Sequence, residues 1–489
     1  MALDRLNGQI SDVGLADYAV DQYNISKLNE SYLCVSLKEK FVATIGKPIN
    51  LDVLDRGWMP TDSVQSPCMA MIVCHGMGQQ VPFETLDELA SAISEEHTLK
   101  NGDDTVEVIL RFVLPTGSEK PLPRAEITLK QLGKPNKTVH LYEAYWAPLT
   151  EGAISYRQTA LKIMKAGFNG LKEGFKQKFS RWMFGGNKDL PIDHGTGRLL
   201  IVLLAIITPV LLIPTLIGFG LKSVIVGYMI DSKDIILFII LLIVLTYISY
   251  KIQYFIIQYM GDVIIYVSSN EVNSFWKIRD DIKQIGLNLA KIVYGAVNND
   301  HTHLSKKLKN KFDPHFLYSK ITIVGHSLGS VIAYDTLNAI INQDKLDSGA
   351  RNVVERTEAL ITFGSPMDKV AFLFRQMAKD ALAREMLAAA HQPMILSYEN
   401  RPKWWINIFC KVDIISGSLE YFDDPKSTVQ QQRSVRNYRD LYNNWLRPVN
   451  AHTGYWKRSP TKKILYLAAT SSLDTLDENS FRYVKIRKI

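Results

Sequence analysis

The sequence predicts an α/β fold with a mostly parallel sheet, interrupted by an inserted α-helical membrane hairpin. Apolar and β-branched runs of strand length recur along the chain, and the run that ends at Val324 passes directly into a helical pattern. A second strand-like run, 69–74, ends in a glycine-containing turn. Two long apolar stretches, 199–221 and 235–257, separate these parts of the predicted sheet.

The chain divides into four predicted segments. Its 489 residues suffice for two or three domains, or for one large domain that carries an insertion. Residues 1–67 form an N-terminal segment that the sequence leaves unassigned, and 68–150 supply the first part of the core. Residues 151–270 hold the insertion, and 271–489 return to the core.

The sequence of the predicted insertion indicates two membrane spans. Residues 199–221 contain 23 positions without a charge, and a bilayer core requires about 20. After a short polar connector, a second apolar run extends to about Ile257, with Lys251 placed to snorkel. We therefore expect an integral membrane protein with spans at about 199–221 and 235–257 and a lipid bilayer as partner. A buried helical hairpin inside a soluble core is the alternative.

A basic amphipathic segment precedes the first span. Residues 157–198 hold nine Lys or Arg against three Asp or Glu, so they contribute +6 of the total net charge of +8. Basic residues beside apolar and aromatic ones favour an interfacial helix on an anionic membrane. By the positive-inside rule, we expect the soluble domain on the cytoplasmic side.

Composition excludes several functional classes. The positive charge is local, which does not favour nucleic-acid binding. The four cysteines are scattered without metal-ligand spacing, and the sequence contains no P-loop. We therefore expect no cofactor and no metal.

A reactive serine is predicted shortly after the strand-like run 321–324. The sequence Gly325-His326-Ser327-Leu328-Gly329 has the Gly-x-Ser-x-Gly pattern, and a helical pattern follows it at once. A nucleophile elbow requires this order of strand, sharp turn and helix. Glycines on both sides of the serine permit close approach of the strand and the helix. Ser327 is therefore the candidate nucleophile.

A second motif supplies candidate oxyanion donors. The strand-like run 69–74 ends in His75-Gly76-Met77. Acyl transfer requires two N–H donors aimed at the developing oxyanion. We assign one to the backbone of Leu328, directly after the nucleophile, and the other to the backbone of Met77.

A serine hydroxyl requires a base and an orienting acid, which in this fold follow the serine in the order acid, then histidine. His452 lies in a predicted polar loop before the strand-like run 462–470 and is the preferred base; His391 is the alternative. Asp413, at the end of a strand-like run, is the preferred acid. Asp368, just after the strand 359–363, is the alternative acid.

These motifs together resemble lipase-like serine hydrolases of the α/β-hydrolase fold, of bacterial type. The resemblance rests on "VCHGMGQQ", "VGHSLGSVIAYD", "TFGSPMD", the Asp413 segment and "AHTGYW", in that order. It covers residues 68–80 and about 319–470. It implies a triad of Ser327, Asp413 and His452, with an oxyanion hole near Met77. The long insertion departs from the family pattern and leaves the substrate undefined.

The function expected from the sequence is a membrane-anchored serine esterase or lipase that hydrolyses carboxylic esters through an acyl-serine. A lipid or phospholipid substrate is inferred from the predicted membrane location alone. A thioesterase, a protein de-acylase or an acyltransferase would use the same triad. A non-catalytic membrane scaffold with a hydrolase fold is the alternative from another class.

Overall fold

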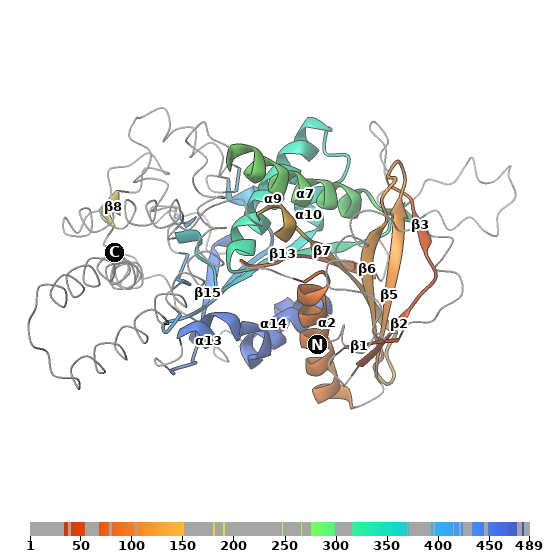
Figure 1. The fold of residues 1–489 in the computed structure, drawn as a ribbon, viewed down its shortest axis with the longest axis horizontal. Coiled ribbons are helices and arrows are strands. Elements are labelled where there is room, and N and C mark those ends of the chain that lie inside the picture. Colours follow the sequence, from red (N-terminus) through yellow and green to blue (C-terminus); the bar gives the residue numbers. More distant parts are fainter. Residues whose placement is uncertain are drawn as a thin grey trace, which may run out of the picture.

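The computed structural model describes most of a central sheet and the helices that cover it (Figure 1). The described residues are 34–37, 41–53, 68–77, 81–102, 105–150, 275–298, 315–368 and, with short gaps, 393–476, together with 179–180, 189–190, 482–483 and the single positions 247, 266 and 370. Almost all of the predicted insertion, 151–270, lies outside them.

The strands of the described residues belong to one large sheet and two small ones. Their bounds are β1 (Cys34–Leu37), β2 (Phe41–Ile45), β3 (Ile49–Leu51), β4 (Cys68–Cys74), β5 (Val106–Pro115), β6 (Leu122–Leu129), β7 (Lys137–Ala144), β8 (Phe179–Ser180), β9 (Asp189–Leu190), β10 (Val297–Asn298), β11 (His315–Phe316), β12 (Lys320–His326), β13 (Thr357–Phe363), β14 (Trp404–Cys410), β15 (Val435–Asp440) and β16 (Arg482–Tyr483). The small sheets are the antiparallel pairs β8–β9 and β10–β11.

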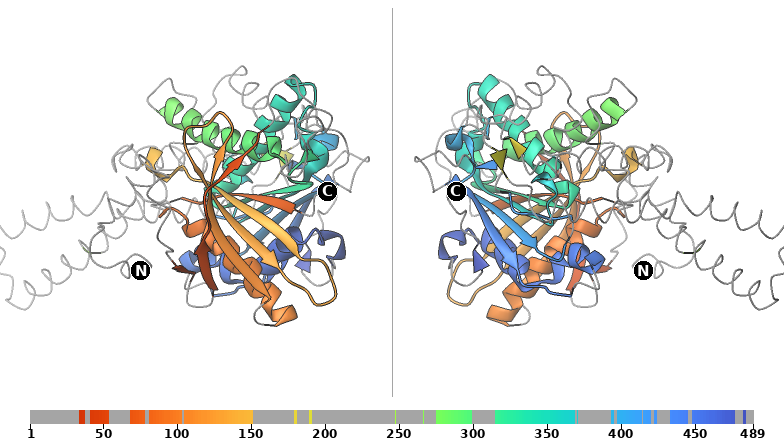
Figure 2. Two further views of the ribbon diagram at one scale, coloured as in Figure 1. Left: turned by 90° about the vertical axis from the view of Figure 1, so that its right-hand side faces the viewer. Right: turned by 90° about the vertical axis from the view of Figure 1, so that its left-hand side faces the viewer.

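The large sheet has 12 strands in the order β1-β2-β5-β6-β7-β4-β12-β13-β14-β15-β16, with β3 paired to β5. Pairing is parallel from β7 through β4, β12, β13 and β14 to β15. It is antiparallel for β1–β2, β5–β6, β6–β7 and β15–β16. The predicted α/β fold with a mostly parallel sheet is thus confirmed. Two end-on views show the twist expected of such a sheet (Figure 2).

Helices cover both faces of the sheet. Their bounds are α2 (Glu84–Asn101), α7 (Phe275–Gly295), α9 (Leu328–Leu346), α10 (Val353–Arg356), α13 (Pro448–Thr453) and α14 (Ser459–Ala469), with single 3₁₀ turns η3 (Ala147–Leu149), η6 (Tyr398–Asn400), η9 (Tyr455–Lys457) and η10 (Leu473–Thr475). Helices α7, α9 and α10 lie on one face, and α2, α13 and α14 lie on the other (Figure 1).

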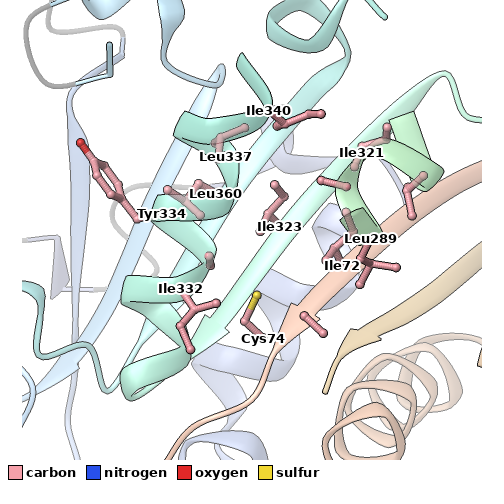
Figure 3. Close-up of a cluster of buried hydrophobic side chains, with 14 of the residues drawn as sticks. Ile72, Cys74, Leu289, Ile321, Ile323, Ile332, Tyr334, Leu337, Ile340 and Leu360 are labelled. Atoms are coloured by element: carbon pink, nitrogen blue, oxygen red, sulfur yellow. The ribbon is translucent and has the colours of Figure 1, made fainter. Parts of the chain in front are cut away.

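The central strands are apolar because both of their faces are covered. All seven residues of β4 are buried, and so are all seven of β14. Helix α9 packs directly on β4 and β12, where Leu337 and Ile340 meet Ile323 (Figure 3). Full burial of each such aliphatic side chain is worth about 1.5–3 kcal/mol relative to exposure. This core fixes the junction between β12 and α9.

One strand predicted from the sequence is instead a helix. Residues 462–470, read as strand-like, belong largely to α14. Pro460 occupies the first turn of this helix, and the buried Ile464, Leu465 and Ala468 recur at helical spacing on the face toward α2. His452, expected in a loop, lies in the last turn of α13.

None of the helices in the described part of the chain combines the length and the apolar character that a bilayer span requires. The longest of these helices, α7, carries Lys277, Arg279 and Asp280 near its start. This finding overturns the predicted localisation, an integral membrane protein with two spans. The ranges 199–221 and 235–257 themselves lie outside the described residues, apart from the exposed Tyr247. The two-span localisation is therefore withdrawn.

The topology brings several strand ends to one edge of the sheet. The carboxyl ends of β4, β12, β13 and β14 are adjacent because these strands are neighbours and parallel. In open α/β sheets, this edge is where sites form. Met77, Ser327, Asp368 and Asp413 follow these strands, whereas His452 comes later in the chain, after β15.

Candidate active site

Ser327 lies at the junction of β12 and α9 in a strained backbone conformation. Its φ of 54° and ψ of −129° are unusual for a residue with a side chain. Two hydrogen bonds hold the turn: the Ser327 N–H donates to the Phe363 carbonyl at 3.0 Å, and the Ser330 N–H donates to the Ser327 carbonyl at 2.9 Å. The strand-turn-helix geometry predicted from the sequence is therefore present.

The two glycines of this turn allow its close packing. A Cβ at Gly325 would lie 2.5 Å from the Ser330 Cα. A Cβ at Gly329 would lie 2.1 Å from the Cys74 carbonyl oxygen and 2.3 Å from that of His75. All three of these neighbours are backbone atoms, which a side-chain rotation cannot move. Gly329 thus lets α9 lie directly against the end of β4.

We expect Gly329→Ala to destabilise the protein by about 1–3 kcal/mol, because the added methyl group would force α9 away from β4. Chemical denaturation measures this free energy of unfolding. Gly286→Ala in α7 is the matched control, since its closest neighbour is the Thr336 side-chain oxygen, which can rotate away. Equal stabilities of the two variants would contradict the steric argument.

His452 connects Ser327 to Asp413. Its Nε2 atom lies 2.8 Å from the Ser327 Oγ, and its Nδ1 atom lies 2.9 Å from the Asp413 Oδ2. A carboxylate only accepts hydrogen bonds, so Nδ1 carries the proton and Nε2 accepts from the serine hydroxyl. All three side chains are buried. This arrangement suits proton transfer from Ser327 to His452.

Asp413 is held as a buried carboxylate. The backbone N–H of Ile415 donates to Oδ1 at 2.9 Å, and the Tyr455 hydroxyl donates to Oδ2 at 3.0 Å. Burial alone would raise the pKa of Asp413. The electrostatic interaction with His452 and the hydrogen bonds from His452, Ile415 and Tyr455 outweigh this effect and lower the pKa of Asp413 to about 2. Asp413 therefore stays ionised at neutral pH.

Asp368, the alternative acid, does not bond to the base. Asp368 is buried after β13, but the Nδ1 atom of His452 donates to Asp413. His391 lies outside the described residues. The geometry therefore favours Asp413 as the partner of His452.

His75 fixes the loop that follows β4. The backbone N–H of Trp146 donates to the His75 Nε2 at 3.0 Å, so the proton of this imidazole is on Nδ1, which donates to the Gly76 carbonyl at 2.9 Å. Burial lowers the pKa of His75 to about 4, and its ring stacks on Trp146 at 4.5 Å. The neutral imidazole thus sets the plane of the Gly76–Met77 peptide.

This loop lies against the serine turn. A Cβ at Gly76 would be 3.1 Å from the Ser327 Cβ, so the two backbones are in close proximity. Met77 follows, buried in the same core as Leu328. The Leu328 N–H lies in the first turn of α9, where amides have no acceptor within the helix. Both predicted oxyanion donors are therefore near Ser327 in the fold.

His326 supports the backbone of the base. Its Nε2 lies 3.1 Å from the His452 carbonyl oxygen, so it donates there, and the two imidazole rings stack at 5.3 Å. Burial and the neighbouring His452 lower the pKa of His326 to about 3. A neutral ring beside the base adds no repelling charge.

Sequence reasoning missed Tyr455. Its hydroxyl contacts Asp413, and although the quoted stretch "AHTGYW" contains this tyrosine, the sequence assigned it no role. The one available signal is its position three residues after His452, which places both side chains on the short segment of α13 and η9. Among the described residues, no group of acidic, histidine or cysteine side chains is suited to hold a metal ion.

Comparison with known proteins adds one finding. A family model described as "Putative serine esterase (DUF676)" matches residues 244–374. The matched range contains the Ser327 turn and β13, whereas Asp413 and His452 follow it in the chain. No curated protein and no solved structure matches. The chain is similar over 244–374 to this esterase family, which supports a serine hydrolase-like protein.

Proposed function

We propose that the protein is a serine esterase that hydrolyses carboxylic esters through an acyl-serine intermediate. One observation carries the proposal: the continuous hydrogen-bonded series from the Ser327 Oγ through His452 to Asp413, at 2.8 and 2.9 Å. The strained turn beneath the serine and the family match over 244–374 support it. A non-catalytic scaffold would not require Ser327, His452 and Asp413 to be hydrogen-bonded in series.

In the proposed reaction, the Ser327 Oγ attacks the ester carbonyl while its proton passes to the His452 Nε2. The imidazolium so formed is stabilised by Asp413, which stays ionised. Collapse of the tetrahedral intermediate breaks the bond to the alkoxy group, which takes the proton from Nε2 and leaves as an alcohol. Water then attacks the acyl-serine with the same base, and the carboxylic acid and free Ser327 are released.

The developing oxyanion would be stabilised by the backbone N–H groups of Met77 and Leu328. The close approach of Gly76 to Ser327 and the position of Leu328 in the first turn of α9 support this assignment. Loss of one such donor typically costs about 10²- to 10³-fold in turnover. His75, Gly76, Gly325, His326 and Gly329 support this backbone.

The proposed substrate is defined by its ester bond. The expectation of a lipid substrate depended on the predicted spans alone, and no contact among the described residues at the carboxyl edge of the sheet favours a lipid over another ester. A thioesterase, a de-acylase or an acyltransferase would form the same acyl-serine and differ in the leaving group or the acceptor.

The test is labelling of the intact protein with a fluorophosphonate, followed by mass spectrometry of its peptides. We expect a single adduct at Ser327, with turnover of short p-nitrophenyl esters that the probe inhibits. Comparison of ester and thioester analogues of one acyl chain then identifies the leaving group. Folded protein that neither takes up the probe nor turns over any ester would overturn the proposal.

A further inference from the structure

We propose that Tyr455 is a positioning residue of the triad. Its hydroxyl holds the Asp413 carboxylate in place and weakens the attraction of this carboxylate for a proton on His452. The inference deepens the proposed function and rests on it. It is carried by the hydrogen-bond pattern around the Tyr455 oxygen, which leaves one direction for the phenolic proton.

Three groups surround the Tyr455 oxygen. The Cys410 N–H, which can only donate, lies at 2.9 Å. The Ser416 hydroxyl lies at 2.9 Å, and the Asp413 Oδ2 lies at 3.0 Å. Since the carboxylate only accepts, the phenolic proton points to Asp413, and the Ser416 hydroxyl donates to Tyr455. Burial and the nearby charge of Asp413 raise the pKa of Tyr455 well above its usual value, so the phenol keeps this proton.

Tyr455 and His452 share one carboxylate oxygen. The Oδ2 atom accepts from the Tyr455 hydroxyl and from the His452 Nδ1, while Oδ1 accepts from the Ile415 N–H. These donors satisfy the buried carboxylate and fix its rotation toward the imidazole. Each of them also disperses its negative charge, which weakens its hold on a proton of His452.

The ring of Tyr455 contacts other groups than its hydroxyl does. The guanidinium of Arg458 lies 4.5 Å from the ring centroid, and the ring packs beside Phe363 and close to Gly364. Arg458 also forms an ion pair with Asp440 at 2.5 Å. Because these contacts involve the ring face and edge, Tyr455→Phe removes the hydroxyl and retains the packing.

The experiment is the pH dependence of fluorophosphonate labelling for the wild type and Tyr455→Phe. For the variant, we expect the acid limb of the rate profile to move to higher pH by about half a unit, because a carboxylate with one donor fewer holds the imidazole proton more strongly. We also expect the plateau rate to fall by about tenfold. A structural defect alone would lower the plateau and leave the limb in place.

Tyr294→Phe is the matched control, since Tyr294 is also buried and its hydroxyl bonds to Thr357 at 2.7 Å, outside the site. Its profile should coincide with that of the wild type. If Tyr455→Phe fails to fold, Ser416→Ala, which removes the donor to Tyr455, should move the limb in the same direction. An unshifted limb in the folded variant would overturn the role of Tyr455. Absence of labelling in the wild type would instead overturn the proposed esterase activity.

Discussion

Ser327→Ala is expected to reduce ester turnover by about 10⁶-fold and to abolish fluorophosphonate labelling, because the acyl-serine can no longer form. The substitution removes only the Oγ atom that lies 2.8 Å from His452. Alanine retains the Cβ of the strained turn, so the fold should persist. Turnover by the purified variant, with labelling followed by mass spectrometry, measures the effect.

Ser330→Ala is the matched control for this loss. Ser330 is also buried in the first turn of α9, but its hydroxyl donates to the Gly325 carbonyl at 3.0 Å. Its removal should cost about 1 kcal/mol of stability and retain labelling. Equal labelling of Ser327→Ala and the wild type would show that another nucleophile reacts with the probe.

Asp413→Asn is expected to lower turnover by about 10⁴-fold with little change in structure. The amide has nearly the shape of the carboxylate but lacks the charge that stabilises the imidazolium of His452. Its NH₂ group would also face a donor in either orientation, because His452 and Tyr455 donate to Oδ2 and the Ile415 N–H donates to Oδ1. Steady-state kinetics at neutral pH, with circular dichroism as a check on folding, measure this loss.

The same substitution at the alternative acid provides the control. Asp368 is buried after β13 and remains the competing assignment from the sequence. We expect Asp368→Asn to retain turnover within about tenfold, since the imidazole Nδ1 donates to Asp413. A larger loss at Asp368 than at Asp413 would exchange the roles of the two carboxylates.

The serine turn could be predicted from the sequence because its causes are local. A buried strand, two glycines and an apolar helical repeat all lie within 320–346, and each of them constrains its neighbours in the chain. The apolar run of β4 was recognisable for the same reason, since a strand covered on both faces reads as an uninterrupted apolar segment.

The segment around His452 shows where local patterns fail. Residues 462–470 are apolar enough to read as a strand, and their helical form is fixed by packing of α14 on α2, which lies more than 300 residues away in the chain. The helix before it, α13, carries His452 to Ser327. Tyr455 reaches Asp413 only because α13 and η9 lie beside the end of β14.

The sequence by itself determined the α/β class and the serine turn, because chain-local glycine, strand and helix signals encode them. Tertiary structure alone decided which side chains meet. It joined His452 to Asp413 in preference to Asp368, placed Gly76 against Ser327, and added Tyr455. Contacts between residues so far apart depend on the pairing and twist of parallel strands, which no short stretch of sequence encodes.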